Sequence, residues 1–396
     1  MLTFLHAADL HLGLRITRFD EERAHRIREA RFRALANILK AAQEGAVDFL
    51  LIAGDLFDDH AVDALTARRA FEMLDSAPCP VFIIPGNHDP LLPGAVWDRS
   101  PWNTTAPRQV HLCRESQPCT VAPGVLLFPC PLYRKTSVNN PVTWVTQQPP
   151  DTRIRIGLAH GSLKVRDDLP IDDHLIDRNA AQQGKLDYLA LGHWHRRQQF
   201  PGEDGVVRTA YCGVHEPMRF QGQEDDGTGW NPYTRGHRRE EFADAGQGEV
   251  LHVTLPGPGE PPRLRPIDVG YLQWHRESRA LASGAELTAL IAEVSQRLLP
   301  ERRLLSLKLS GTLDAEAMPR LQELEQILQG SYAYGALDTA ALRLRPTAEQ
   351  VRKLAGQGIV GGVAAKLETL RADPAQAAIA EKALLVLYHL LQELPA

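Results

Sequence analysis

The sequence is poor in the features that mark secreted and membrane proteins. No apolar run approaches the roughly 20 residues that are needed to cross a bilayer. Residues 1–6 lack the basic and apolar regions of a secretory signal, so we expect a protein of the cytoplasm without a membrane segment. Cysteine is also scarce, and no pair has C-x-x-C spacing, so neither a disulfide framework nor a zinc knuckle is expected. The five cysteines are Cys79, Cys113, Cys119, Cys130 and Cys212.

Positive charge is not in excess either. The 396 residues carry a formal net charge of −5, which provides no general attraction to nucleic acid. Any contact with DNA must therefore use local basic patches. Hydrophobic residues make up 43% of the chain and charged residues 23%, proportions that are typical of a globular protein. The length is sufficient for two or three domains.

What the sequence does contain is a set of apolar strands that end abruptly in polar residues. Amphipathic helices at 21–43 and 62–77 connect the first three of these strands as βαβ units. In a parallel sheet such strand ends lie side by side at one edge, where α/β proteins bind ligands. The strands are 2–8, 47–53, 80–85, 153–159 and 186–191, and they end in Asp9-Leu10-His11, Gly54-Asp55-Leu56-Phe57-Asp58, Gly86-Asn87-His88-Asp89, His160-Gly161-Ser162 and Gly192-His193-Trp194-His195.

The residue types at these strand ends suit a divalent metal. In Asp9-x-His11 and His193-x-His195, alternation places both side chains on one face of an extended segment. A carboxylate and imidazoles on one face can ligate a divalent cation. Each cluster alone is also compatible with an ordinary strand-to-loop turn. Five of them together are hard to explain by packing, because buried strands do not need polar ends of this kind.

In their order along the chain, these motifs resemble those of a known superfamily. The set D-x-H, G-D-x-x-D, G-N-H-D, H-G and G-H-x-H is similar to that of the calcineurin-like metallophosphoesterases. The segments HAADLHLG, IAGDLFD, IPGNHDP and LDYLALGHWH resemble the SbcD-type DNA repair exonucleases, and the YhaO-like branch most closely. The resemblance covers roughly residues 1–255. It implies an α/β fold in which two sheets are stacked between helices, the metallophosphoesterase αββα sandwich.

The resemblance also implies two metal ions and their ligands. One ion would be held by Asp9, His11 and His195. The other would be held by Asn87, His160 and His193, with Asp55 bridging both because a carboxylate has two oxygens. Mixed oxygen and nitrogen ligands suit Mn²⁺ first, with Fe²⁺ or Zn²⁺ as alternatives. Two such ions, roughly 3.5–4 Å apart, would acidify an attacking water and neutralise charge on a phosphodiester.

Two further residues are implied to act in catalysis rather than in metal binding. By resemblance, His88 contacts the phosphate and protonates the departing sugar oxygen as a general acid. Asp58 would pair with His88 and hold its imidazole oriented. For Asp58 an alternative is open, which is that it caps the helix expected at 62–77.

Beyond about residue 255 the resemblance fades, and we predict three parts in the chain. They are a metallophosphoesterase nuclease domain at 1–270, a small α/β capping domain at 271–345 and a helical C-terminal tail at 346–396. Within the first part, we expect residues 221–248 to form a long surface loop. We also expect the arginines on the polar face of the helix at 21–43, including Arg31, to be solvated.

The tail carries its own signals. Thr347-x-x-Gln350 has the spacing of a helix capping box. The last helix, at 383–391, is apolar almost all round, so we expect it to be buried within this chain or against a partner. In the resembled nucleases a C-terminal helical segment docks on the coiled coil of an SbcC-like ATPase. The resemblance therefore implies DNA, an SbcC-like ATPase and a second copy of the chain as partners.

Three functions fit these features. The first is a metal-dependent DNA exonuclease or endonuclease that hydrolyses phosphodiester bonds with two metals and acts in DNA repair. The second is a phosphodiesterase or phosphatase for nucleotides or other phosphoesters that are not DNA. The third is a DNA-binding scaffold with a relic site. The complete ligand set weighs against the third, and the predicted cap and tail weigh against the second.

Overall fold

The computed structural model describes residues 1–396 except 18, 104–105, 219–247, 347 and 394–396. The surface loop predicted at 221–248 therefore lies outside the described residues, except for Gly248. Of the predicted capping box, Thr347 lies outside them and Gln350 is described. The chain divides into two compact units, Met1–His275 and Arg276–Ala396. The division into three parts stays a prediction.

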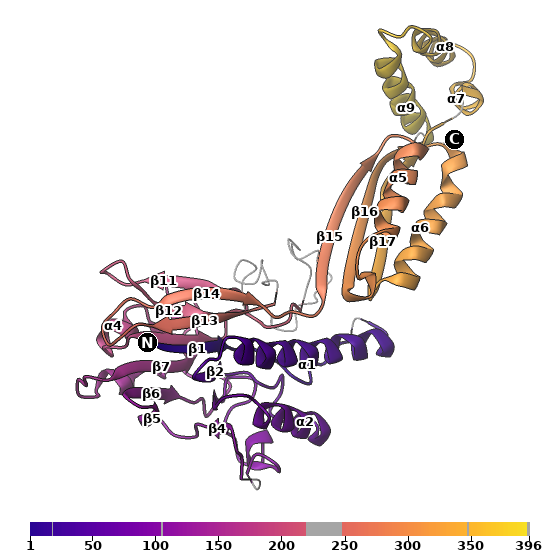
Figure 1. Ribbon diagram of the computed structural model, residues 1–396. Helices are drawn as coiled ribbons and strands as arrows, with labels where there is room; N and C mark the ends of the chain where they lie inside the picture. The colour runs from indigo at the N-terminus through magenta and orange to yellow at the C-terminus, as the bar shows by residue number, and fades with distance from the viewer. Residues whose placement is uncertain (18, 104–105, 219–247, 347, 394–396) are drawn as a thin grey trace. The chain divides into compact units, whose positions relative to one another are not determined.

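The first unit contains two six-stranded sheets (Figure 1). One has the order β14-β13-β1-β2-β3-β4, and the other has the order β11-β12-β10-β7-β6-β5. In the first sheet β1 to β4 are parallel, and in the second β6, β7, β10 and β12 are parallel. The strands are β1 (Leu2–Ala7), β2 (Phe49–Ala53), β3 (Val81–Ile84), β4 (Val110–Leu112), β5 (Cys119–Ala122), β6 (Val125–Cys130), β7 (Ile154–His160), β10 (Tyr188–Gly192), β11 (Gln198–Pro201), β12 (Val207–Tyr211), β13 (Glu249–Leu255) and β14 (Arg263–Asp268). A separate small ribbon pairs β8 (Leu163–Lys164) with β9 (Ile176–Asp177).

Three apolar clusters hold this unit together and define its layers. Between the two sheets pack side chains such as Phe4, Phe49 and Leu158. On the outer side of the first sheet lie α1 (Glu21–Glu44) and α2 (Ala64–Asp75), and on that of the second lie the short helices α3 (Thr143–Thr146) and α4 (Ala180–Gln183). A 3-10 turn, η1 (Val96–Asp98), adds Trp97 to the α1–α2 layer. The predicted αββα sandwich is confirmed.

The helices α1 and α2 each begin where a side chain satisfies their first main-chain donors. Asp20 accepts a hydrogen bond from the Arg23 N–H at 2.9 Å and caps α1. Asp63 accepts from the N–H groups of Leu65 and Thr66 and caps α2. The cap of α2 is thus Asp63, so the alternative in which Asp58 has this role is wrong.

The second unit is a three-stranded sheet covered by two helices, followed by three helices. The sheet order is β15-β16-β17, and β16 and β17 are parallel. Its core joins Leu287 of α5, Leu307 of β16 and Leu324 of α6. The elements are β15 (Gln273–Leu281), α5 (Gly284–Ser295), η2 (Pro300–Arg302), β16 (Arg303–Leu313), η3 (Ala315–Ala317), α6 (Met318–Ser331), β17 (Tyr334–Leu344), α7 (Ala348–Ala355), α8 (Ile359–Arg371) and α9 (Ala377–Glu393).

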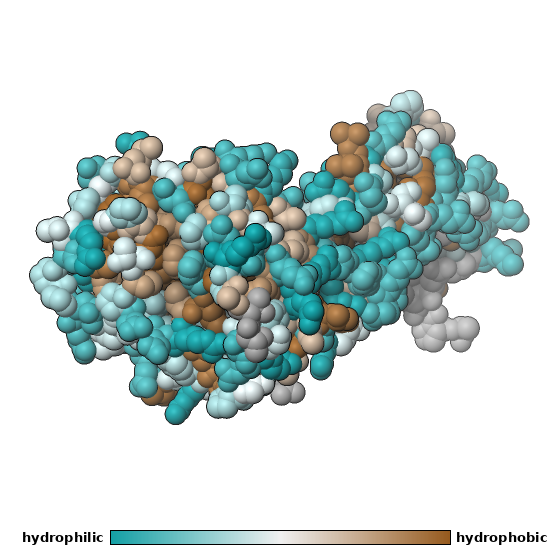
Figure 2. Space-filling view, turned by 60° about the horizontal axis from the view of Figure 1, so that its bottom comes forward, coloured by the Kyte–Doolittle hydropathy of each residue, from teal (hydrophilic) through white to brown (hydrophobic). Residues whose placement is uncertain are grey.

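The hydropathy of the surface and of the helices is as expected from a composition typical of a globular protein. Figure 2 shows a face on which hydrophilic residues predominate and hydrophobic residues lie in scattered groups. Among the described residues, no helix combines the length and the apolar character that a membrane span requires.

Candidate metal centre

The sandwich brings the polar strand ends of both sheets to one place. Asp9 follows β1 and Asp55 follows β2, and these strands are neighbours in the first sheet. His160 ends β7 and pairs in register with Gly192 at the end of β10, in the second sheet. Because β2 contacts both β7 and β10 across the sandwich, residues that are far apart in the sequence converge.

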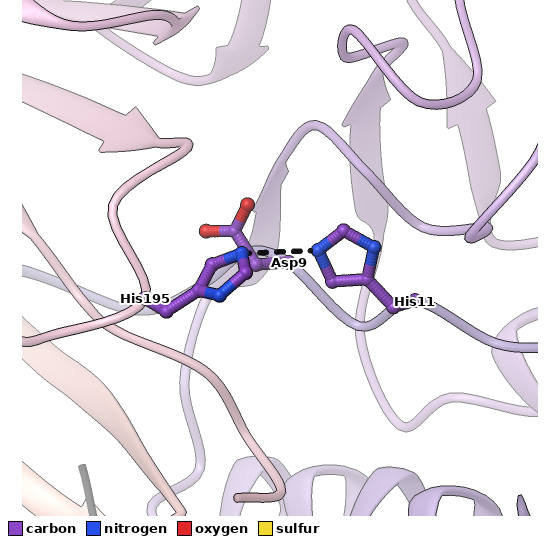
Figure 3. Close-up of side chains that lie close together, drawn as sticks. All are labelled: Asp9, His11 and His195. Carbon is purple, nitrogen blue, oxygen red and sulfur yellow. Dashed lines mark hydrogen bonds between the residues drawn. The ribbon is translucent and has the colours of Figure 1, made fainter. Parts of the chain in front are cut away.

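The first predicted ligand set is assembled. Asp9, His11 and His195 are all buried and offer ligand atoms that lie within 4.8 Å of one another. The Nε2 atoms of His11 and His195 are 3.2 Å apart, and the Asp9 carboxylate lies beside the His195 ring (Figure 3). A carboxylate and two imidazoles that converge in this way form a suitable set of donors for a divalent cation.

The second predicted set is assembled beside the first. Asn87 Oδ1 lies 2.7 Å from His160 Nε2 and 3.1 Å from His193 Nδ1. Asp55 Oδ2 lies 3.3 Å from His160 Nε2 and 3.9 Å from His11 Nε2. Asp55 therefore stands between the two sets, and its role as a bridging ligand stays a prediction.

The two predicted catalytic residues lie together at the edge of these sets. The His88 N–H donates to Asp55 Oδ1 at 2.8 Å, and the ring Nδ1 lies 2.8 Å from the main-chain oxygen of Asp58. The Asp58 carboxylate is farther, with 3.9 Å between Oδ1 and His88 Nδ1, and the same oxygen is 3.4 Å from His11 Nδ1. The main-chain oxygen, rather than the predicted carboxylate, is thus the nearer partner of His88.

The glycines of the motifs are required by close approach. A Cβ atom on Gly86 would lie 2.1 Å from Asp55 Oδ1, and one on Gly192 would lie 2.0 Å from the Ala53 oxygen. Gly54 has φ of 88°, and its Cβ would lie 2.3 Å from His160 Nδ1. Each glycine next to a ligand therefore makes room for another part of the site.

Several ligands adopt a backbone conformation that side chains disfavour. The φ angles of Asp9, His11, Asp55 and His193 are 55°, 44°, 52° and 107°. Such conformations cost about 1–3 kcal/mol each and persist where the surroundings enforce them. Here the Asp9 N–H donates to the Gly54 oxygen at 3.1 Å, and the His11 N–H donates to the Asp55 oxygen at 3.0 Å. Strain is therefore concentrated where the predicted ligands lie.

The electrostatics of the site favour a bound cation. Burial raises the pKa of Asp9 to about 6 and that of Asp89 to about 8, and burial lowers the pKa of His11 to about 4. Burial also opposes charge on Asp55 and His160, but their mutual attraction holds the Asp55 pKa well below its usual range and raises the His160 pKa to about 9. Divalent cations would supply the positive charge that these buried carboxylates lack, so the residues present fit a metal.

Two supporting residues escaped the sequence analysis. The Asp89 carboxylate accepts from the N–H groups of Gly86 at 2.7 Å and Phe57 at 2.9 Å, and so joins two of the motif loops. Its position at the end of G-N-H-D was a signal for such a role. Arg31, expected in solvent, is fully buried and donates to the main-chain oxygen of Leu10 at 2.8 Å. That expectation was wrong, because Arg31 lies within the apolar stripe of α1.

A third such residue, Asp173, lies in the segment between the ribbon strands β8 and β9. Its Oδ1 is 3.1 Å from His193 Nε2. No strand-end motif contains Asp173, and nothing in its sequence neighbourhood pointed to the site.

Comparison with known proteins agrees with this geometry. Residues 2–197 match the family model of the calcineurin-like phosphoesterases, so the chain carries a calcineurin-like metallophosphoesterase domain. Among its relatives is the uncharacterized metallophosphoesterase YhaO of Bacillus subtilis, which is 30% identical over 52% of this chain and 52% of its own length. The SbcD component of the SbcCD nuclease of Escherichia coli is 25% identical over 55% of this chain and 62% of its own length.

A shorter match involves an archaeal protein. The DNA double-strand break repair protein Mre11 of Aeropyrum pernix is 35% identical over 22% of this chain and 20% of its own length. In each of these alignments the chain spans less than two thirds of the relative's length. The relatives therefore agree with the predicted family and with its SbcD-type and YhaO-like branch.

Proposed function

We propose that the chain is a metal-dependent phosphodiesterase that cleaves DNA, with residues 1–270 as its nuclease domain, 271–345 as a cap and 346–396 as a tail. The observation that carries the proposal is the convergence of two complete ligand sets on Asp55, which lies 3.3 Å from His160 Nε2 and 3.9 Å from His11 Nε2. When bound, two ions of the Mn²⁺, Fe²⁺ or Zn²⁺ type supply an acidified water and charge neutralisation at the phosphate.

The residues of the chain have separate tasks in this proposal. Asp9, His11 and His195 hold one cation, while Asn87, His160 and His193 hold the other. His88 is the least buried of the central imidazoles, with 26% of its side chain exposed, so it can reach a bound phosphodiester. Its imidazole protonates the departing sugar oxygen, and Asp58 keeps the ring in place.

DNA is favoured as the substrate over nucleotides and other phosphoesters for two reasons. Two relatives are named as part of a nuclease and as a DNA double-strand break repair protein. The unit Arg276–Ala396 also goes beyond what hydrolysis of a small phosphoester requires. A role in DNA repair is proposed on the same grounds.

Cleavage assays test this proposal directly. Linear duplex DNA, single-stranded DNA and bis-p-nitrophenyl phosphate are each incubated with the protein and Mn²⁺. Cleavage of DNA that is lost in Asp55→Asn supports a nuclease. Hydrolysis of the small ester without any cleavage of either DNA would favour the alternative phosphodiesterase.

The C-terminal helices support a protein partner. On α9, Ile379, Val386 and Leu390 are 75%, 52% and 57% exposed. Their spacing of seven and four residues places them on one helical face, as in a helix that packs on a coiled coil. Of the two alternatives predicted for this helix, burial within the chain does not account for this face, so a partner is proposed. An SbcC-like coiled-coil ATPase is the proposed occupant, and a second copy of this chain is an additional proposed partner.

A binding experiment separates these partners. Immobilised protein is exposed to an SbcC-like ATPase of the same organism, and its own mass is measured by light scattering. Replacement of Ile379, Val386 and Leu390 by serine is expected to abolish capture of the ATPase, whereas Glu381→Gln, on the opposite side of the same helix, retains it. Equal capture by both variants would remove this face from the interface.

A further inference from the structure

The ring of His193 has a different neighbour at each nitrogen. Nδ1 lies 3.1 Å from Asn87 Oδ1, within the second ligand set, and Nε2 lies 3.1 Å from Asp173 Oδ1. Both side chains of the second pair are largely buried, at 14% and 11% exposed. A carboxylate accepts a hydrogen bond, so it favours the proton on Nε2 and leaves the lone pair of Nδ1 for a metal.

Asp173 is itself held by a directed chain of hydrogen bonds. Trp194 Nε1 donates to Ser162 Oγ at 3.0 Å, and Ser162 Oγ donates to Asp173 Oδ2. The direction is fixed, because an indole N–H can only donate and a hydroxyl has a single proton to give. The Trp194 ring stacks on Tyr211, with 4.6 Å between the ring centroids. The first donor in this series of hydrogen bonds is therefore held in place by packing.

A glycine allows Asp173 to come this close. Gly161 has φ of 149°, and a Cβ atom there would lie 2.3 Å from the main-chain oxygen of His174. The Ser162 N–H also donates to the main-chain oxygen of Asp173 at 3.3 Å. In the motif His160-Gly161-Ser162, the first residue is a predicted ligand, the second admits the segment 173–174, and the third orients the Asp173 carboxylate.

We infer that Asp173 is a positioning residue for the second metal, and that Ser162 and Trp194 fix its carboxylate. Asp173 is not one of the seven predicted ligands. It acts through His193, by holding the imidazole in the tautomer and orientation that aim Nδ1 at Asn87 and His160. This inference rests on the proposed two-metal function and adds a residue that lies in none of the five strand-end motifs.

The test is a titration of the metal-free protein with Mn²⁺, followed by calorimetry and electron paramagnetic resonance. Loss of a residue that orients a metal-ligating histidine typically costs 10–100-fold in metal affinity. Asp173→Ala is therefore expected to weaken one of the two Mn²⁺ sites by about 10–100-fold and to leave the other unchanged. Ser162→Ala is expected to weaken Mn²⁺ binding at the same site by a smaller factor. Asp172→Asn, an exposed neighbour, is the matched control with wild-type binding.

Spectroscopy separates positioning from general damage to the fold. At two equivalents of Mn²⁺, the wild type gives the spectrum of a coupled pair of ions and Asp173→Ala gives that of isolated ions. Excess Mn²⁺ restores the coupled spectrum in the variant, which a collapsed site could not do. Two sites of wild-type affinity in Asp173→Ala would overturn this inference alone. A wild type that binds fewer than two Mn²⁺ ions would overturn the proposed function as well.

Discussion

At the scale of the residue, Asp55 connects the parts of the site. Its Oδ1 accepts the His88 N–H at 2.8 Å, and its Oδ2 faces His160 and His11. One carboxylate thus fixes the proposed general acid and stands between the two ligand sets. The backbone of Asp55 is in the left-handed region, at φ of 52°, and follows Gly54 at φ of 88°. The backbone conformation of the turn after β2 therefore sets the position of the Asp55 carboxylate.

The role of His88 predicts a difference between substrates. A sugar oxygen is a poor leaving group and needs a proton, whereas p-nitrophenolate leaves without one. His88→Ala is expected to reduce DNA cleavage by about 10²–10⁴-fold and hydrolysis of bis-p-nitrophenyl phosphate far less. Steady-state rates with both substrates and saturating Mn²⁺ provide the comparison. Equal losses for both substrates would exclude His88 as the general acid.

A second prediction at this scale concerns His6 and acid stability. Burial lowers the pKa of His6 to about 3, although the hydrogen bond to the Leu191 oxygen partly offsets this effect. The unfolded chain binds a proton below about pH 6.5 and the folded chain does not, so the contribution of His6 is complete above that pH and is lost as the pH falls toward 3. The loss of folding free energy that His6 causes between about pH 7 and pH 5 amounts to about 2 kcal/mol.

Urea unfolding of the metal-free protein at these two pH values measures this contribution. His6→Gln has no titrating group at this position and is expected to lose about 2 kcal/mol less than the wild type over the interval. An unchanged pH dependence would show that His6 titrates normally in the folded state.

At the scale of the element, α1 supports the first motif through Arg31. Its guanidinium donates to main-chain oxygens of Leu10 at 2.8 Å, Asp9 at 3.4 Å and Glu216 at 3.3 Å. These bonds tie the strained turn after β1 to the segment after β12. Arg28, on the same helix, forms an exposed pair with Glu21 instead.

Replacement of Arg31 should therefore destabilise the protein and the first motif together. Arg31→Met leaves buried carbonyl groups without a donor and is expected to lower the free energy of unfolding by about 3 kcal/mol. Arg28→Met is the control, with a change below about 1 kcal/mol because its ion pair is on the surface. Denaturant unfolding compares the two variants. Equal and small changes would contradict the supporting role of Arg31.

The strands and their polar ends were predictable because two simple patterns coincide there. Buried strands are continuous apolar runs, and the polar residues that follow them have no packing explanation. β15 was less visible, because residues 275–279 in its middle are all polar and only Trp274 and Leu281, near its ends, are buried. The positive φ angles of Asp9 and His11 could not be predicted from the residue types at these positions. Asp173 is brought to His193 by tertiary packing alone, so no local pattern could reveal it.

At the scale of the whole molecule, the predicted ligands and the second unit lie in different parts of the sequence. All seven predicted ligands lie within Met1–His275, and the exposed apolar face of α9 lies within Arg276–Ala396. A chain that ends at His275 is therefore expected to retain Mn²⁺-dependent hydrolysis of bis-p-nitrophenyl phosphate and to lose capture of an SbcC-like ATPase. Activity and capture assays on this shortened chain test the division. Loss of hydrolysis in a folded shortened chain would show that the second unit contributes to the site.

The most direct test of the metal centre is anomalous scattering from crystals soaked with Mn²⁺. Two peaks, roughly 3.5–4 Å apart, are expected on either side of Asp55. One should lie among Asp9, His11 and His195, and the other among Asn87, His160 and His193. Peaks elsewhere in the molecule, or no peak beside Asp55, would contradict the central claim that these strand ends form a two-metal site.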